Sequence, residues 1–306
     1  MAKARKDTPK RRQCGTMVVH NRLLERDPGY RGRLAAIEAA TQRHLMMAAV
    51  RRPKRIVIPV VVHVVFNIAA DNISDAQVKS QINVLNRDYR AKNTDKKKVP
   101  AVWSGLVGDA DIGFALARKD PSGKATTGIT RTNTTQTSFS DDDGVKSAAT
   151  GGVNAWPTDR YLNIWACALG GGLLGYAQFP GGPPATDGVV ILNTAFGTVG
   201  TAAAPFNLGR TATHEVGHWL NLHHIWGDGG VQSCQDSDFI HDTPNQAGPN
   251  FGKPTFPHVS CTNGPNGDMF MNYMDYVDDD TMVMFTAQQV ARIQAALAGP
   301  RNKIGR

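Results

Sequence analysis

The chain has 306 residues, 41% of them hydrophobic and 20% charged, which is the composition of a globular protein with one large domain or two small ones. No run of about twenty apolar residues is present, so the sequence excludes a transmembrane helix, and we expect no membrane partner. The net charge of +8 is uneven, because residues 1–55 hold 15 Lys and Arg against 4 Asp and Glu, whereas the remainder holds 19 against 22. The bulk of the chain therefore lacks the distributed basic surface that nucleic-acid binding requires.

The N-terminal segment is rich in Arg and poor in large apolar residues, and it ends at the basic run 51–55. Residues 1–6 are basic, but no apolar stretch follows them, so this sequence shows no signal peptide. One interpretation of residues 1–55 is a disordered basic tail. The other is a propeptide of residues 1–54 with a processing site at its end. Cys14 favours the propeptide, because its thiolate would be a strong ligand for a zinc ion; the alternative is that Cys14 is an incidental free cysteine.

The first predicted elements after this segment form a βαβ unit. Residues 56–66 are β-branched and almost entirely apolar, which predicts a strand buried on both faces, with His63 as a core histidine. Ser74 then opens a helix, and Gln77 is expected to complete a capping box. A second strand follows at 112–118. A helix between two strands indicates a parallel pair with a crossover connection.

The next part of the chain alternates loops with strands. Residues 119–157 are rich in Gly, Thr, Ser and Asp, and we expect surface loops there. Residues 161–169 predict a third strand, in which Cys167 is an inert core thiol. The segment 175–180 follows three glycines and ends in Pro, which is typical of an edge strand. Residues 188–193 form the last predicted central strand.

A metal-binding motif follows. His214 and His218 belong to an H-E-x-x-H sequence, and on a helix they lie one turn apart, so both imidazoles can face one metal ion. Glu215 lies next to the first histidine and can reach a metal-bound water without being a ligand itself. A third ligand must come from another direction to leave one position open.

His224 can supply that third ligand if the helix ends after His218 and the chain turns back. Asn221 stands at the position of the turn, and Asn tolerates the left-handed backbone conformation better than most residues. His223 competes for the role, but its spacing does not fit, so we interpret it as a neighbour.

An acidic loop comes next, in residues 234–244. Its oxygen-bearing side chains suit Ca²⁺, and the candidate ligands are Asp236, Asp238, Asp242 and Thr243. The alternative is a solvated acidic loop. Cys234 and Cys261 flank it, either as a disulfide, which would contribute about 3 kcal/mol in the chain-entropy model, or as two reduced thiols of a cytosolic protein. Residues 286–297 predict a C-terminal amphipathic helix.

The sequence H-E-x-x-H-x-x-N-x-x-H, followed by Asn272-Tyr273-Met274-Asp275-Tyr276, resembles the pappalysin family of metzincin metalloproteases. The resemblance covers about residues 55–300 and departs from the general metzincin pattern at Asn221, where Gly is usual. It implies an α/β catalytic domain at 55–306, with a twisted mixed five-stranded sheet, an antiparallel edge strand and an active-site helix. An N-terminal subdomain at 55–223 would precede a mostly irregular C-terminal subdomain at 224–306 that ends in a helix.

The resemblance also implies a function, namely a secreted and monomeric zinc endopeptidase that acts on proteins or peptides. Its own propeptide would be its inhibitor, with Cys14 similar to the cysteine switch of metzincin zymogens. Glu215 would be the general base, and Tyr276 would hydrogen-bond the tetrahedral oxyanion. Met274 would lie in a tight turn beneath the zinc. The alternatives are a catalytically silent, zinc-stabilised binding module and a zinc hydrolase of a non-peptide substrate.

Substrate contacts follow from the same resemblance. The edge-strand residues Gly175, Tyr176 and Ala177 would pair with the substrate by strand addition. An acidic residue at Asp280 would lie in the S1′ pocket and select Arg or Lys on the carboxyl side of the cut bond. The other interpretation of the triplet 278–280 is a solvated turn or further calcium ligands. The resemblance also implies calcium at Asp238 and Thr243, which lie at positions that match the family.

The bond between Lys54 and Arg55 would then be one that the enzyme itself prefers. We therefore expect the protein to remove its own propeptide in trans, leaving a mature chain that begins near Arg55.

Overall fold

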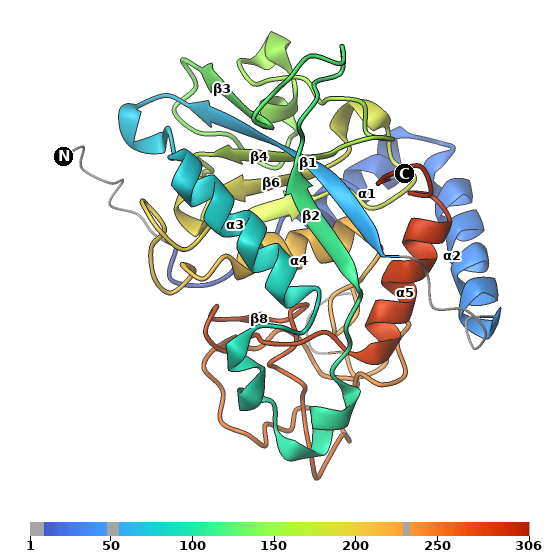
Figure 1. Cartoon of the computed structure of the whole chain (residues 1–306). Helices are drawn as coiled ribbons and strands as arrows, with labels where there is room; N and C mark the ends of the chain where they lie inside the picture. The colour runs from blue at the N-terminus through green and yellow to red at the C-terminus, as the bar shows by residue number, and fades with distance from the viewer. Residues whose placement is uncertain (1–8, 48–54, 229–232, 306) are drawn as a thin grey trace.

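A twisted β-sheet forms the centre of the molecule (Figure 1). The structure is a computed structural model, and it describes residues 9–47, 55–228 and 233–305. The main path of the sheet has the order β2-β1-β4-β6-β5, and each pair is parallel except β5 with β6. This path confirms the predicted sheet with an antiparallel edge strand. The strands of the whole sheet are β1 (Ile56–Phe66), β2 (Ile112–Leu116), β3 (Ile129–Asn133), β4 (Leu162–Cys167), β5 (Gly175–Ala177) and β6 (Val189–Leu192).

Strand β3 makes the sheet six-stranded and lies in the stretch 119–157, where we expected loops only. It pairs in parallel with the second half of β1, whereas β2 pairs with the first half. Its residues are half-buried or exposed, so it lacks the apolar run that identified the central strands. Short 3-10 turns link the larger elements at Ala69–Asp71, Thr94–Lys98, Ala101–Leu106, Gly144–Lys146, Ala148–Thr150, Pro184–Thr186 and Asn193–Ala195.

Helix α3 (Asp75–Asp88) connects β1 and β2 and packs on β2, which confirms the βαβ unit. Ser74 caps the helix by accepting a hydrogen bond from the amide of Gln77, but the predicted capping box is wrong. The Gln77 side chain instead donates to the carbonyls of Asn193 and Phe196. A buried carbonyl without a hydrogen-bond donor is unfavourable, so the Gln77 side chain bonds these carbonyls and does not complete the capping box.

Residues 16–47 of the N-terminal segment are almost entirely helical, so the interpretation of this part as a disordered tail is wrong. Helix α1 (Thr16–Arg26) follows Gly15 directly, and α2 (Tyr30–Met47) packs along α5 (Ala287–Ala298) near the other end of the chain. Glu38 of α2 pairs with the buried Arg292 of α5 at 2.5 Å. The basic run 51–54 lies outside the described residues.

The part of the chain after the metal-motif helix α4 (Arg210–Trp219) is mostly irregular, as predicted. It contains β7 (Phe251–Gly252) and β8 (Tyr276–Val277), which form a short parallel pair, and then α5, which Thr286 and Gln289 cap with a complete capping box. The predicted disulfide between Cys234 and Cys261 is present and excludes the reduced pair.

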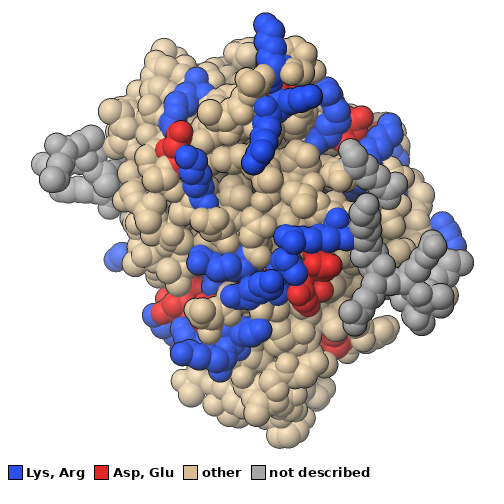
Figure 2. Space-filling model, in the orientation of Figure 1, with Lys and Arg blue, Asp and Glu red and all other residues tan. Residues whose placement is uncertain are grey.

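Charged side chains of both signs lie together on the face shown in Figure 2. Arg90 pairs with Asp111 at 3.2 Å, and Arg131 pairs with Asp75 at 2.6 Å. Within the described ranges, no helix has both the length and the apolar character needed to cross a membrane.

Candidate metal centre and substrate cleft

The metal motif lies on α4 and in the turn that follows it. The helix ends at Trp219, and Asn221 has a φ of 72°, the left-handed conformation that the turn was expected to need. The amide of Leu222 then donates to the carbonyl of Gly217 at 2.9 Å. This turn brings His224 back towards the helix.

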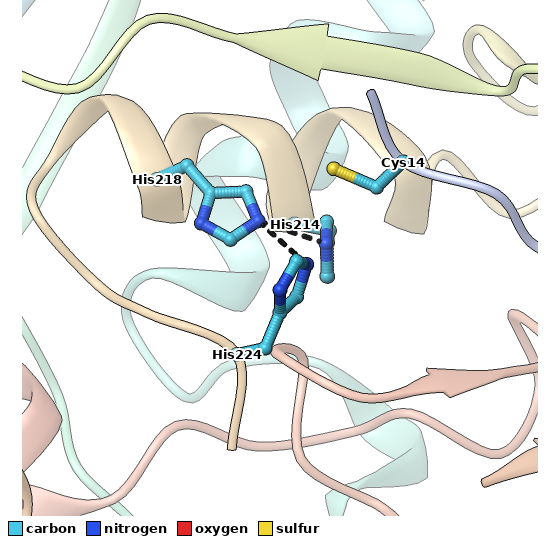
Figure 3. Close-up of side chains that lie close together, drawn as sticks. All are labelled: Cys14, His214, His218 and His224. Atoms are coloured by element: carbon cyan, nitrogen blue, oxygen red, sulfur yellow. Dashed lines mark hydrogen bonds between the residues drawn. The ribbon is translucent and has the colours of Figure 1, made fainter. Parts of the chain in front are cut away.

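Three imidazoles converge beside the helix (Figure 3). The Nε2 atom of His218 lies 3.1 Å from the Nε2 atoms of both His214 and His224. The Nδ1 atoms of His214 and His218 face the carbonyls of Tyr273 and Leu222 at 2.7 Å, so each neutral ring donates from Nδ1. The Nε2 atoms therefore carry lone pairs that point at one another, and a cation between them removes the conflict. This donor set fits a zinc ion.

Cys14 completes the cluster from the N-terminal segment. Its Sγ atom and one ring nitrogen of each of the three histidines lie within 4.8 Å of one another, the one such group of His, Cys, Asp and Glu among the described residues. The thiol also lies 3.3 Å from Oε2 of Glu215. The thiol of Cys14 therefore faces the three histidines from the N-terminal segment.

Glu215 is buried beneath this cluster. Its Oε2 accepts a hydrogen bond of 2.9 Å from the hydroxyl of Thr16, which in turn accepts from the amide of Ala177 at 2.8 Å. Burial raises the pKa of Glu215 to about 7, against the opposing hydrogen bonds from Cys14 and Thr16. A side chain on Gly175 would come within 3.0 Å of Glu215 Cγ, so the edge strand needs glycine at this point.

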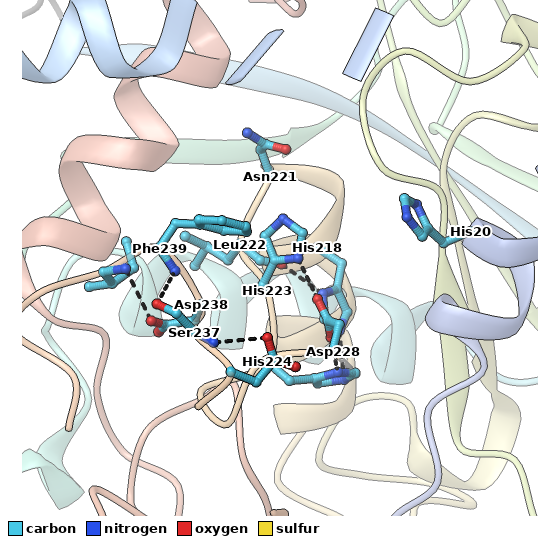
Figure 4. A network of polar contacts seen from close by, with 12 residues as sticks. His20, His218, Asn221, Leu222, His223, His224, Asp228, Ser237, Asp238 and Phe239 are labelled. Atoms are coloured by element: carbon cyan, nitrogen blue, oxygen red, sulfur yellow. Dashed lines mark hydrogen bonds and ion pairs between the residues drawn. The ribbon is translucent and has the colours of Figure 1, made fainter. Parts of the chain in front are cut away.

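Asp228 supports the third histidine and was not predicted from the sequence. One carboxylate oxygen accepts from Nδ1 of His224 at 2.8 Å, and the other pairs with His223 (Figure 4). Burial alone would raise the pKa of Asp228, but the hydrogen bonds from both histidines overcome it and hold the pKa well below its usual value. A carboxylate four residues after a proposed ligand is the signal that could have found it. His223 is confirmed as a neighbour outside the cluster.

The second motif lies directly under α4. A side chain on Gly217 would approach the sulfur of Met274 to 2.5 Å, so helix and turn are in close contact at the expected floor of the site. Tyr276 places its hydroxyl 3.2 Å from Nε2 of His224. This hydroxyl is therefore at the histidine cluster.

Residues 13–16 run along the edge strand β5 and in parallel with it. The amide of Leu174 donates to the carbonyl of Gln13 at 3.0 Å, and the amide of Gly15 donates to the carbonyl of Gly175 at 2.9 Å. The N-terminal segment thus occupies the edge that was predicted to receive substrate.

Arg12 extends from this segment into a closed pocket and is 3% exposed. It donates to Oδ1 of Asp279 at 2.7 Å, to the hydroxyl of Thr211 at 3.0 Å and to the carbonyl of Val277 at 3.3 Å. Asp279 is fully buried and also accepts from the amides of Leu208 and Arg210. The structure therefore places one carboxylate of the triplet 278–280 at the base of this pocket.

That carboxylate is not the predicted one. Asp280 has a 41% exposed side chain and pairs with Lys253 at the surface. Asp279 and Asp280 lie in a turn in which the amide of Thr281 donates to the carbonyl of Asp278 at 2.9 Å, and within this turn Asp279 is buried whereas Asp280 reaches the surface. The prediction of Asp280 in the pocket is corrected to Asp279.

The comparison with known proteins now identifies the family. Residues 148–298 match the peptidase family described as pregnancy-associated plasma protein-A. An extracellular metalloprotease of Pyricularia oryzae is 32% identical over 301 residues, which are 94% of this chain and 88% of that one. The chain belongs to this metalloprotease family. An extracellular metalloprotease of Arthroderma otae is 34% identical over 79% of this chain and 77% of that one.

Solved structures agree with this metalloprotease family. Mature mirolysin of Tannerella forsythia in complex with a cleaved peptide is 54% identical, with a TM-score of 0.81, and covers 83% of this chain and 97% of that one. A promirolysin mutant of the same organism is 49% identical, with a TM-score of 0.88 over 96% and 97% of the two chains. The prediction of a metzincin-type metalloendopeptidase is thereby confirmed, and a silent binding module is excluded.

The metalloprotease family and the histidine cluster together identify zinc as the metal. Zinc held by three imidazoles polarises a carbonyl and lowers the pKa of a bound water towards 7. Glu215 has its carboxylate at the cluster, where it would serve as the group that takes up a proton from an attacking water. In the present structure, Cys14 and Thr16 take both hydrogen bonds that its Oε2 accepts.

The four residues predicted to bind calcium lie in different surroundings. Asp238 is buried and accepts from the hydroxyl of Thr243 at 2.8 Å. Asp242 instead accepts from Thr286 and from the amide of Gln288, so it caps α5. Asp236 lies against Gly227. The four predicted ligands therefore do not converge on one point.

Proposed function

We propose that this metalloendopeptidase is made as a latent zymogen and cuts on the amino side of Arg and Lys. Residues 1–54 are its propeptide. The observation that carries the proposal is Arg12, whose guanidinium is buried against Asp279 while Cys14, two residues later, faces the three histidines. The propeptide thus supplies from its own chain the side chain that the pocket selects in substrates.

The pocket chemistry supports this selectivity. Asp279 is held by two backbone amides and faces the cavity with its remaining oxygen, which only a cationic side chain of sufficient length can satisfy. A buried carboxylate without a partner costs several kcal/mol, so small or apolar side chains bind poorly here. The aromatic ring of Phe206 lies 5.0 Å from the guanidinium carbon of Arg12 and favours a planar cation.

The comparison structures support the propeptide assignment. Mature mirolysin covers 83% of this chain, and promirolysin covers 96%. The basic bond at Lys54-Arg55 fits the proposed specificity, so the enzyme removes its own propeptide. We place the enzyme outside the cell as a monomer, in keeping with relatives named extracellular metalloproteases and with the disulfide.

Asp279→Asn tests the proposal, with Asp280→Asn as the matched control. Peptides released from a mixed protein digest are identified by mass spectrometry for the parent and both variants. The parent and Asp280→Asn should cut before Arg and Lys, because Asp280 is exposed and paired with Lys253. Asp279→Asn should lose this preference by about tenfold or more, since its pocket no longer compensates a buried cation. An Asp279→Asn enzyme that still cuts only before Arg and Lys contradicts the pocket assignment.

A further inference from the structure

The surface beneath helix α1 combines an apolar floor with an acidic rim, and the latent state alone does not require this combination. Helix α1 starts at Thr16, next to the metal cluster, and continues away from the Arg12 pocket. Arg12 and Thr16 lie on opposite sides of Cys14 along β5. If the residue after the cut bond occupies the Arg12 pocket, the residues before that bond must extend across the metal onto the surface that α1 covers.

This surface has an apolar floor. Val19 of α1 is completely buried, and Leu23 is half-buried one turn later. Both belong to a cluster built by the catalytic domain, whose buried members include Phe139, Val145 and Tyr176. When the propeptide leaves, this apolar floor becomes exposed to solvent beside the edge strand, where substrate is bound.

The rim of the same surface is acidic. Arg22 of α1 donates to the carbonyl of Asp141 and pairs with the carboxylate of Asp143 at 2.5 Å. Asp143 also neutralises the buried Lys146, at 2.8 Å. Asp141 makes no side-chain hydrogen bond or ion pair within the described part of the chain, and a Cβ on Gly15 would lie 3.1 Å from its Oδ2.

A cavity continues the rim on its other side. Asp141 and Phe139 line an open space of about 540 Å³, which Gln13 of the propeptide borders. The loop that carries Asp141 and Asp143 therefore lies between this cavity and the surface that α1 covers, which we call the seat of α1. A free carboxylate between two openings can meet a basic side chain from either side.

We propose that in the mature enzyme the seat of α1 is a second specificity surface, which binds substrate residues on the amino side of the cut bond. It takes one bulky apolar side chain on the floor of Phe139, Val145 and Tyr176 and one Arg or Lys side chain at Asp141 and Asp143. The inference rests on the proposed function, because it places the cut bond by the Arg12 pocket. Val19 and Arg22 hold these seats in the latent chain.

The test uses the full chain after activation and a peptide library in which the four residues before and the first residue after the cut bond are all varied. Mass spectrometry reports every cut peptide. A bulky apolar residue should be favoured over Ala by about tenfold at one of the four positions. Arg or Lys should be favoured over Glu by at least about threefold at another, as expected for a partly exposed ion pair.

Charge reversal sharpens the test. Asp141→Lys should invert the preference between basic and acidic residues at that position. Asp159→Lys carries the same change in charge at an exposed residue lining another cavity, with Arg301 and Pro183, and should leave the preference as in the parent. An Asp141→Lys enzyme with the profile of the parent overturns the acidic rim.

The two proposals fail in different ways. A parent profile that is flat at all four positions but retains Arg or Lys after the cut bond overturns the second surface alone, whatever happens to the variants. A profile selective before the bond but indifferent after it overturns the Arg12 pocket alone.

Discussion

The N-terminal segment and the catalytic domain are held in place by different forces. The domain is built around one continuous apolar cluster that extends from β1 to α5. The segment buries few apolar side chains and is fixed mainly by polar anchors, such as Arg12 on Asp279 and Glu38 on Arg292. Apolar burial is spread over many contacts, whereas an ion pair fails completely when one partner is removed. The segment is therefore bound firmly but can be lost through changes at a few points.

The largest effect should come from Glu215→Ala, which separates catalysis from metal binding. Activity should fall by about 10²- to 10⁴-fold, because the general base is lost while the three histidines are untouched. The variant should also remain full length under conditions in which the parent is trimmed. Metal analysis of the purified variant provides the check, and loss of stoichiometric zinc together with activity would show that Glu215 has another role.

The second-largest effect should come from Arg12→Ala, which weakens the polar attachment of the N-terminal segment. It leaves Asp279 buried without a cation, which costs about 3–5 kcal/mol. In a Glu215→Ala background, amide exchange in residues 13–26 should become at least about a hundredfold faster. Arg11→Ala is the matched control, because Arg11 is exposed and only covers the ring of Phe251. Equal exchange in the two variants would contradict the role of Arg12.

Cys14→Ala and Thr16→Val should shorten the delay before activity appears, and Cys14→Ala should do so more. The first removes the proposed fourth ligand. The second leaves Glu215 Oε2 and the amide of Ala177 each short of one hydrogen bond, which costs about 1–3 kcal/mol. The mature enzymes should match the parent in kcat/KM, since both residues leave with the propeptide. A Cys14→Ala protein as latent as the parent shows that the thiol is incidental.

The smallest effect concerns calcium at Asp238. Burial raises the pKa of Asp238 to about 7, above the value of about 3.9 expected when unfolded. Without a cation, its contribution to stability is present below pH about 4 and is lost as the pH rises towards 7. Calcium would stabilise the charged carboxylate, so it should raise Tm more at pH 8 than at pH 5. At a hundredfold excess over Kd, bound calcium should add about 2.7 kcal/mol to the free energy of unfolding.

Chelator-treated protein that retains zinc provides the starting point for these melting curves. Asp238→Asn should abolish the calcium increment, whereas Asp242→Asn should lower Tm through the cap of α5 but keep the increment. Melting curves that calcium leaves unchanged at both pH values would leave this loop without a metal.

The sequence predicted the parts of the fold that carry strong local patterns. The apolar run of β1, the cap at Ser74 and the motif from His214 to His224 each depend on neighbours close in sequence. Strand β3 was missed because its Thr and Arg side chains are not buried on both faces, and its pairing with β1 is decided by tertiary structure. Helices α1 and α2 were missed for a related reason, since their low apolar content hid a contact surface that only the domain supplies.

The candidate site shows the same division. Spacing pointed to the three histidines and Glu215, because zinc chemistry restricts residue type and separation. Cys14 was predicted from the ligand chemistry of a thiolate and from the resemblance to metzincin zymogens. The resemblance pointed to Asp280, with Asp278 and Asp279 as the next candidates, and it could not decide which member of the triplet is buried; in the structure this is Asp279. Arg12 and Thr16 were overlooked as well, although an Arg two residues before the switch cysteine could have been read against an acidic pocket.

The direction of residues 13–16 along β5 determines the kinetics with which activity develops. A substrate that adds to β5 in the antiparallel sense presents its peptide bond in the opposite polarity, so the parallel segment is not cut where it lies. If the enzyme removes its own propeptide as proposed, a molecule whose cleft this segment fills cannot cut itself and depends on a neighbour that is already open. Activity should therefore follow a sigmoidal time course, whose lag shortens on concentrating the protein and disappears on seeding with a trace of mature enzyme.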